Sequence, residues 1–399
     1  MTRISRDQRN VAVLATCQML FGTARSLVVS TAPLISYAMA TEKALATLPH
    51  ALVIVGTALL TLPAALLMRR IGRRNGFAIG GLVGAVGGVV CVYAVLGGYF
   101  WWFSLGTLLF GASAGFAQHY RFAVTDVASA DYRSKAISLV LAGGVISGFA
   151  GPELAKLSKD MFLPTVFLGP YFFLIGIALL SSIVVMFVDI PNLTPREAAA
   201  PSRPMRAIMR QPVFVTAVVA ATIGQGVMNL LMTAAPLAMQ HAHHPFDDTA
   251  FVIEWHIVCM FAPGFFTGSL IRRWGEIPII LAGMVLLALC VPIALAGKTV
   301  FLFWASMALL GLGWNFAFTA GTALLADAHT QSERAKTQGW VNFIIYGVAA
   351  ASALAAGPLL HFFSWDVVNY VALPMIGVAI FVTLYYAWMQ KQAIPAQGE

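Results

Sequence analysis

Charged residues are scarce in this sequence of 399 residues. Asp, Glu, Lys and Arg make up only 10% of it, against about one quarter in soluble globular domains. Hydrophobic residues make up 59%, and the mean hydropathy is +0.82. Water is therefore not the main solvent of this chain, and we expect a lipid bilayer as its principal partner.

Several motifs are missing, and each absence excludes a class of protein. No complete Gly-x-x-x-x-Gly-Lys-Ser/Thr phosphate-binding loop is present, because Gly297-Lys298-Thr299 has Pro292 where the first glycine of that loop would stand, and this argues against an ATP-driven pump. No catalytic constellation indicates an enzyme or a bound cofactor. The first apolar stretch is too long for a signal-peptide core and lacks a small-residue cleavage site, so we expect a retained helix. The cysteines show no paired spacing, which argues against a disulfide framework. They are Cys17, Cys91, Cys259 and Cys290.

What the sequence does contain is a series of twelve apolar stretches, each of roughly the 20 residues that cross a bilayer core. They predict an all-α membrane protein with twelve transmembrane helices. The expected spans are 10–39, 46–69, 76–97, 100–129, 136–157, 166–188, 211–239, 250–271, 276–297, 300–327, 337–361 and 366–389.

The basic residues gather in alternate loops between these stretches. Eighteen lie at one set of helix ends, and the other set carries four, which are Lys43, Lys156, Lys159 and Lys298. Cytoplasmic loops of membrane proteins carry the excess of Lys and Arg. This pattern predicts that both termini are cytoplasmic, and it accounts for the net charge of +8 without nucleic acid as a partner.

Similar short segments recur at an offset near 200 residues. Residues 69–72 read Arg-Arg-Ile-Gly and residues 272–275 read Arg-Arg-Trp-Gly. Gly-Pro pairs stand at 151–152 and 357–358. Duplicated bundles are typical of transporters. We expect two pseudo-symmetric six-helix bundles, 1–190 and 211–399, joined by a cytoplasmic linker over 191–210 that contains a short surface helix.

The segment 69–74, Arg-Arg-Ile-Gly-Arg-Arg, resembles the loop between the second and third helices of the major facilitator superfamily. That family commonly has an acidic residue where Arg69 and Arg272 stand, so the charge contacts of the loop must differ here. The resemblance implies the fold of that superfamily and alternating access around a midplane site. It places the site mainly on the first, fourth, seventh and tenth helices, with support from the second, fifth, eighth and eleventh.

Two spaced pairs in neighbouring spans are candidate metal ligands. Met228 and Met232 lie four residues apart in span 211–239, and His256 and Met260 do so in span 250–271. Residues four apart share one helix face. Thioether and imidazole ligands favour copper, whereas zinc prefers thiolate, imidazole and carboxylate. The alternative interpretation is packing for the methionines and an interhelical hydrogen bond or proton transfer for the histidine.

These two pairs on neighbouring helices resemble the signature of the CcoA-type copper importers, a bacterial branch of the superfamily. The resemblance implies a secondary-active importer that moves copper across the bacterial inner membrane and supplies assembly of cbb3-type cytochrome oxidase. Copper would be its substrate rather than a cofactor. We expect a monomer. The same branch lies close to riboflavin transporters.

Further side chains could assist the metal. Cys259 lies inside the second pair and is an auxiliary ligand candidate. His241, His243 and His244 follow the seventh predicted helix, where they could capture copper or form a solvated polar loop.

Charged residues inside or near the helices are candidates for coupling or gating: Arg25, Arg121, Asp126, Glu153 and Asp327. Arg25 would repel a metal cation and attract an anion. It therefore favours the alternative function, a proton-coupled transporter of a small organic molecule such as riboflavin or a drug. A sensor or assembly factor with a transporter fold is a third interpretation.

Overall fold

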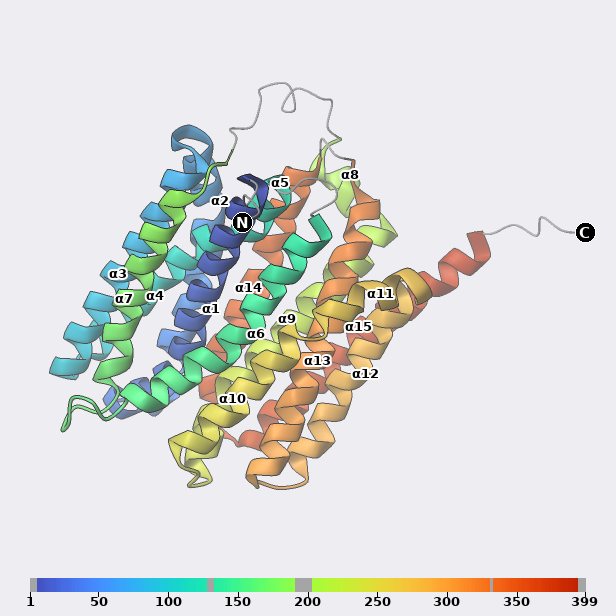
Figure 1. Ribbon diagram of the computed structural model, residues 1–399. Helices are drawn as coiled ribbons and strands as arrows, with labels where there is room; N and C mark the ends of the chain where they lie inside the picture. Colours follow the sequence, from blue (N-terminus) through green and yellow to red (C-terminus); the bar gives the residue numbers. More distant parts are fainter. Residues whose placement is uncertain (1–5, 128–132, 191–202, 331–332, 394–399) are drawn as a thin grey trace, which may run out of the picture.

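The computed structural model describes residues 6–127, 133–190, 203–330 and 333–393. All regular elements in these ranges are helical (Figure 1). The first seven helices are α1 (Arg6–Met39), α2 (Leu48–Ile71), α3 (Arg73–Gly97), α4 (Phe100–Ala117), α5 (Tyr120–Val127), α6 (Arg133–Ser158) and α7 (Leu168–Val184). The next four are α8 (Met205–Met209), α9 (Pro212–His241), α10 (Phe246–Phe261) and α11 (Gly264–Trp274). The last four are α12 (Glu276–Leu295), α13 (Val300–Leu324), α14 (Arg334–Phe362) and α15 (Trp365–Ala393). Short 3₁₀ turns stand at Lys43–Leu45, Val185–Phe187 and Leu325–Ala328.

Helices suit this composition because lipid offers no hydrogen-bond partners, and a helix satisfies its backbone groups internally. Ten helical segments of the described chain are long and apolar enough to cross a bilayer, and the bent pair α10 and α11 adds an eleventh. The remaining predicted span, 136–157, lies on α6, which is 26 residues long. The molecule is therefore an all-helical, multi-pass membrane protein, as the sequence predicts.

Two predicted spans are interrupted. The sequence predicts one continuous span over 100–129, but α4 ends at Ala117, and the backbone N–H of His119 bonds to the carbonyl of Phe116 three residues back. The span 250–271 bends by 40° between α10 and α11. Pro263 lies at that bend, and a proline cannot donate the backbone hydrogen bond that a continuous helix requires.

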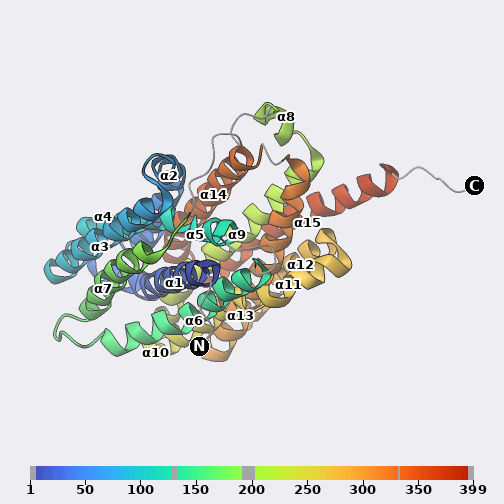
Figure 2. The ribbon, with the colours of Figure 1, turned by 45° about the horizontal axis from the view of Figure 1, so that its top comes forward.

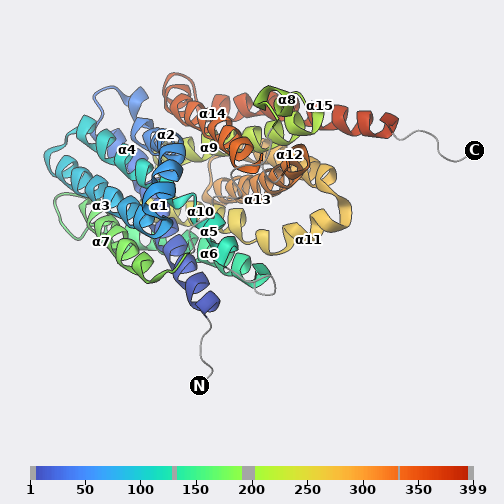
Figure 3. The ribbon, with the colours of Figure 1, turned by 90° about the horizontal axis from the view of Figure 1, so that it is seen from above.

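The helices form two groups, which Figures 2 and 3 show from different sides. Helices α1 to α7 pack against one another on one side, and α9 to α15 do so on the other. The short helix α8 lies at the same end of the molecule as the beginning of α1 (Figure 1). The groups meet mainly where α6 packs against α10 and where α2 packs against α14.

Small residues allow close packing at both of these seams. The Cβ that an alanine would add at Gly148 of α6 would lie 3.1 Å from the Ile257 side chain of α10. At the other seam, the backbone N–H of Gly357 on α14 donates a 3.0 Å hydrogen bond to Oγ1 of Thr47. Glycine and alanine permit such approach of membrane helices. The two groups are therefore in direct contact at the end where α2 begins.

Candidate functional site

A narrow cavity lies between the two groups of helices, where α1 and α2 face α9 and α14. Its walls combine apolar side chains with seven polar ones. The cavity holds a water molecule or two, so a substrate could enter only after the helices around it move apart. The polar lining residues are Arg25, His50, Thr57, Gln118, Gln225, Asn229 and Tyr346.

Arg25 supplies the only charge among the described lining residues, apart from the titratable ring of His50. Within the described ranges, Arg25 forms no ion pair or hydrogen bond. A charged side chain at the centre of a membrane helix costs about 2.5–3.5 kcal/mol on insertion scales, so it is usually retained for a function. The cavity is therefore positively charged.

His50 on α2 is 5% exposed, and its Nδ1 atom has no hydrogen-bond partner in the described structure. It lies within electrostatic reach of Arg25. A buried polar atom without a partner is costly unless a ligand or an ordered water satisfies it. The histidine therefore adds a second unsatisfied group to the same wall.

Two amide side chains, Gln225 and Asn229, lie one turn apart on α9. The Gln225 side-chain oxygen accepts a 2.7 Å hydrogen bond from the indole N–H of Trp314, and Asn229 donates a 2.8 Å bond to the backbone carbonyl of Gln225. The NH₂ group of the Gln225 side chain is then available to donate hydrogen bonds to a ligand. This wall can donate hydrogen bonds to a polar molecule.

None of the four predicted copper ligands lines this cavity. Met228 and Met232 are buried on α9, and Met228 packs within the core of the second group of helices. His256 and Met260 are buried on α10, which packs mainly against α6 and α13 and much less against α9. Neighbouring helices in the sequence are thus not the closest neighbours here.

His256 is directed toward α13. Its Nδ1 lies 2.8 Å from the backbone carbonyl oxygen of Met307, and its Nε2 is buried without a hydrogen-bond partner in the described ranges. The backbone carbonyl of Met260 accepts a 2.6 Å bond from Asn315 on the same helix α13. The contacts of this pair therefore link α10 to α13.

The auxiliary candidates have separate surroundings. Cys259 is partly buried, near the position that a Cβ on Gly311 would occupy. The ring of His241 contacts Tyr37 at 5.5 Å between centroids, and Nε2 of His244 lies 2.6 Å from the Lys298 carbonyl. His243 is exposed. No group of three His, Cys, Asp or Glu residues suited to a metal ion occurs in the described ranges.

The coupling and gating candidates are also dispersed. Arg25 lies in the cavity, Glu153 is exposed and pairs with Lys156 on α6, and Asp327 is exposed after α13. Arg121 and Asp126 belong to α5, and their side chains lie outside the described residues. Of these candidates, Arg25 is the one that the structure places in the cavity.

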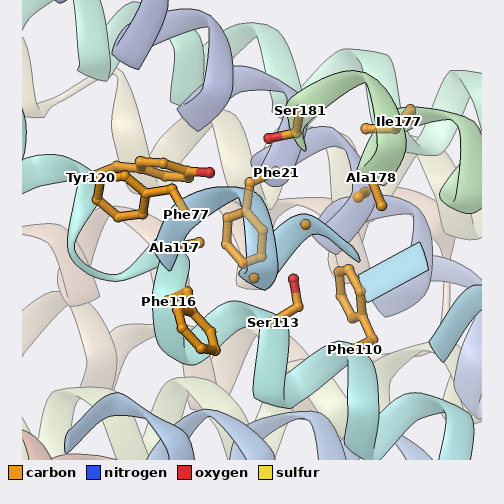
Figure 4. Close-up of a pocket in the computed structure, with 13 residues that line it drawn as sticks. Phe21, Phe77, Phe110, Ser113, Phe116, Ala117, Tyr120, Ile177, Ala178 and Ser181 are labelled. Atoms are coloured by element: carbon orange, nitrogen blue, oxygen red, sulfur yellow. The ribbon is translucent and has the colours of Figure 1, made fainter. Parts of the chain in front are cut away.

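A second hollow lies inside the first group of helices, between α1, α3, α4 and α7 (Figure 4). Aromatic rings surround it, among them Phe21 and Phe110, whose centroids are 6.1 Å apart. Hydroxyl groups of Ser113 and Ser181 supply polar atoms. Because it is enclosed by one group of helices, movement between the groups would not open it alternately to the two sides of a membrane.

The sequence profile described as Major Facilitator Superfamily matches residues 14–262 and 226–398. The chain belongs to the major facilitator superfamily. Members of this superfamily are secondary transporters and not enzymes, which confirms the predicted fold class and the predicted lack of enzymatic activity. The repeated segments and the cavity between two helix groups are consistent with this membership.

Among curated relatives, this superfamily member is 38% identical over 382 residues to "Riboflavin transporter RfnT" of Brucella anthropi, covering 95% of this chain and 96% of that one. It is 29% identical to the uncharacterized transporter YdeG of Bacillus subtilis, covering 93% and 89%. It is 27% identical to YddS of the same organism, covering 95% and 91%. None of these three names mentions copper, so the resemblance is confirmed for the superfamily and not for its copper importers.

Sequence reasoning missed four polar groups of this transporter's central region: His50, Thr57, Tyr346 and Trp314. A histidine near the beginning of an apolar span is a recognisable signal, because polar groups are costly in membrane helices. Tyr346 and Trp314 give no such signal, since both rings are common in apolar segments.

Proposed function

We propose that this protein is a secondary-active transporter of a small ring-containing organic molecule, with riboflavin as the first candidate. The observation that carries the proposal is the 38% identity to a riboflavin transporter along nearly the whole of both chains. The polar cavity supports it, because a few placed polar groups among apolar walls suit an organic ligand.

The cavity chemistry favours such a molecule over a metal cation. Arg25 repels a cation, and the amide of Gln225 presents a donor. A flavin offers ring carbonyls and a polyhydroxyl chain, which accept hydrogen bonds from groups of this kind. Its fused rings are apolar, as are Val28, Val29, Val53 and Ile54 in the wall.

We further propose that residues 1–190 and 211–399 move as two bodies joined by the linker 191–210, in a bacterial inner membrane with both termini cytoplasmic. The contacts between the helix groups at the beginning of α2 and of α10 would then close the periplasmic side. Lys159 and Asp247 form a 2.9 Å ion pair there, and the rings of Phe167 and Phe246 are in contact. Alternating access requires these contacts to open and reform.

Copper import stays a second candidate. The observation that favours it is the buried Nε2 of His256, which has no hydrogen-bond partner in the described ranges and lies on a helix with Met260. The positive charge of Arg25 opposes a copper path through the central cavity. Only if copper is the substrate would the protein supply copper for the assembly of cbb3-type oxidase.

Uptake by cells tests the two candidates side by side. Riboflavin-auxotrophic bacteria without their own riboflavin carrier would express the protein, and uptake of labelled riboflavin and of labelled copper would be followed in parallel. We expect riboflavin uptake above that of empty cells and no added copper uptake. Copper uptake without riboflavin uptake would reverse the order of the candidates.

A further inference from the structure

Arg25 and His50 form an unsatisfied pair on one wall of the central cavity. No carboxylate is among the described residues that line it, and Arg25 has no ion pair or hydrogen bond in the described structure. The Nδ1 atom of the buried His50 likewise has no partner there. Buried charges in membrane proteins are stabilised by opposite charge, by backbone carbonyls or by a ligand. A molecule that enters the cavity is therefore the available partner for the guanidinium of Arg25 and for Nδ1 of His50.

The opposite wall restricts what that partner can be. Trp314 occupies the oxygen of the Gln225 side chain, so this amide offers its NH₂ group. On the wall that carries His50, Thr57 donates its hydroxyl hydrogen within the bundle, to backbone carbonyl oxygens at 2.8 and 3.2 Å, so its oxygen is left as an acceptor. The fixed charge among the described lining residues is the positive charge of Arg25, and the Gln225 NH₂ adds a neutral donor. A ligand that presents acceptor atoms to Arg25 complements this charge, whereas an amine or a metal cation is repelled by it.

We infer that Arg25, with His50 beside it, binds the edge of the substrate that carries two neighbouring acceptor atoms. A guanidinium group presents its N–H donors as a planar fork, which matches the two oxygens of a carboxylate or, on a flavin, a ring carbonyl oxygen together with the unprotonated ring nitrogen beside it. Neutral His50 donates from Nδ1 in one of its two tautomers. This inference rests on the proposed function and adds which end of the ring system faces α1 and α2.

The two sources of paired acceptor atoms, a flavin ring and a carboxylate, can be separated by binding measurements on the purified full-length protein in detergent. Three probes are needed: riboflavin, which has the dioxopyrimidine edge within fused rings; orotate, which has a dioxopyrimidine and a carboxylate without the fused rings; and phenazine, which has three fused rings without carbonyl oxygens. Isothermal titration would give the dissociation constant of each probe.

Arg25→Gln removes the charge and the fork, and Arg25→Lys keeps the charge alone. Arg206→Gln is the matched control, because Arg206 is exposed on α8, outside the cavity. For riboflavin we expect Arg25→Gln to weaken binding roughly ten- to a hundredfold, as for a lost hydrogen bond to a charged group. Arg25→Lys should lie between, and Arg206→Gln should match the unaltered protein. Binding of phenazine should not depend on Arg25.

The outcomes separate the inference about Arg25 from the proposal that riboflavin is the substrate. Equal riboflavin affinity in Arg25→Gln and the unaltered protein would overturn the inference and leave the transport of riboflavin standing. Arg25-dependent binding of orotate without binding of riboflavin would support the inference and contradict the proposed substrate. Binding of neither would contradict both. If Arg25→Gln does not fold, the inference requires that riboflavin affinity fall in Arg25→Lys.

Discussion

The indole N–H of Trp314 on α13 donates a 2.7 Å hydrogen bond to Oε1 of Gln225 on α9. Gln225 lines the central cavity, whereas Trp314 is not among its lining residues. The bond fixes which end of the amide is left for a ligand. A residue outside the cavity therefore sets the hydrogen-bonding character of its wall.

Replacing Trp314 with phenylalanine should weaken substrate binding without unfolding the protein. The change keeps an aromatic ring and removes one hydrogen bond, which is worth about 1 kcal/mol, so KM for riboflavin uptake should rise about fivefold. Trp304→Phe is the control, because the indole N–H of Trp304 has no hydrogen-bond partner in the described ranges. Equal KM values in the two variants would show that the Gln225 amide does not orient the substrate.

The carboxylate of Glu333 should contribute stability that depends on pH. It accepts hydrogen bonds from the Arg203 backbone and guanidinium and from the Thr330 N–H, and these bonds hold the pKa of Glu333 well below its ordinary value of about 4.3. Because the pKa is lower in the folded state, the stabilisation is present above the ordinary pKa and is lost as the pH falls toward the folded-state value.

Glu333→Gln should therefore lower the Tm of the detergent-solubilised protein at pH 7, and the difference from the unaltered protein should shrink as the pH falls below about 4. Glu42→Gln is the control, since Glu42 is exposed. A Tm difference that stays constant from pH 7 to pH 3 would mean that the charge of Glu333 is not what stabilises this region.

Gly357→Ala should weaken the close packing between α2 and α14 by a steric clash. The added Cβ would lie 2.5 Å from Thr47 Oγ1 and 2.6 Å from the Ala44 carbonyl oxygen, and overpacking of this kind costs about 1–3 kcal/mol. The population with this end open should grow about 5- to 150-fold. Gly347→Ala on the same helix is the control, because its added Cβ would have no atom of the described structure within 4 Å apart from its chain neighbours and the nearby backbone of its own helix.

Spin labels on cysteines introduced at Glu42 and Phe363, which are both exposed, would report this opening as a longer distance, after replacement of the native cysteines. A distance distribution in Gly357→Ala identical to that in Gly347→Ala would show that the seam does not close this end.

The methionine pair on α9 should be dispensable for flavin transport. Replacement of both Met228 and Met232 by leucine conserves volume and costs less than about 1.5 kcal/mol at each site, so riboflavin uptake should persist. Met284→Leu, at a buried site on α12, is the matched control. Copper uptake that the double variant loses and Met284→Leu keeps would instead identify the sulfur atoms as copper ligands.

Much of the fold could be predicted from hydropathy and charge, because only long apolar helices cross a bilayer and basic residues gather in the loops on one side of it. The interruptions within the helices could not be predicted in this way. The bend at Pro263 follows from a local rule, yet the sequence does not say whether a proline bends a membrane helix or is accommodated within it. The turn at His119 carries no strong signal, although its ring reaches the Thr61 carbonyl on α2.

The site was harder to predict than the fold for a related reason. Spacing shows that Met228 and Met232, or His256 and Met260, share a helix face, but it does not show which helix that face meets. The structure places α10 against α6 and α13, and the carbonyl of Met307 next to His256. Arg25 was identified as a charge that favours an organic substrate, and its neighbour His50 was revealed only by the packing of α1 against α2.

Transport by the purified protein alone tests the central claim most directly. Proteoliposomes preloaded with unlabelled riboflavin would be diluted into labelled riboflavin, and accumulation of label by exchange would be followed with the unaltered protein, Arg25→Gln and empty liposomes. We expect accumulation with the unaltered protein and a strong reduction in Arg25→Gln. Accumulation no greater than in empty liposomes, with protein shown to be folded and inserted, would contradict riboflavin as the substrate.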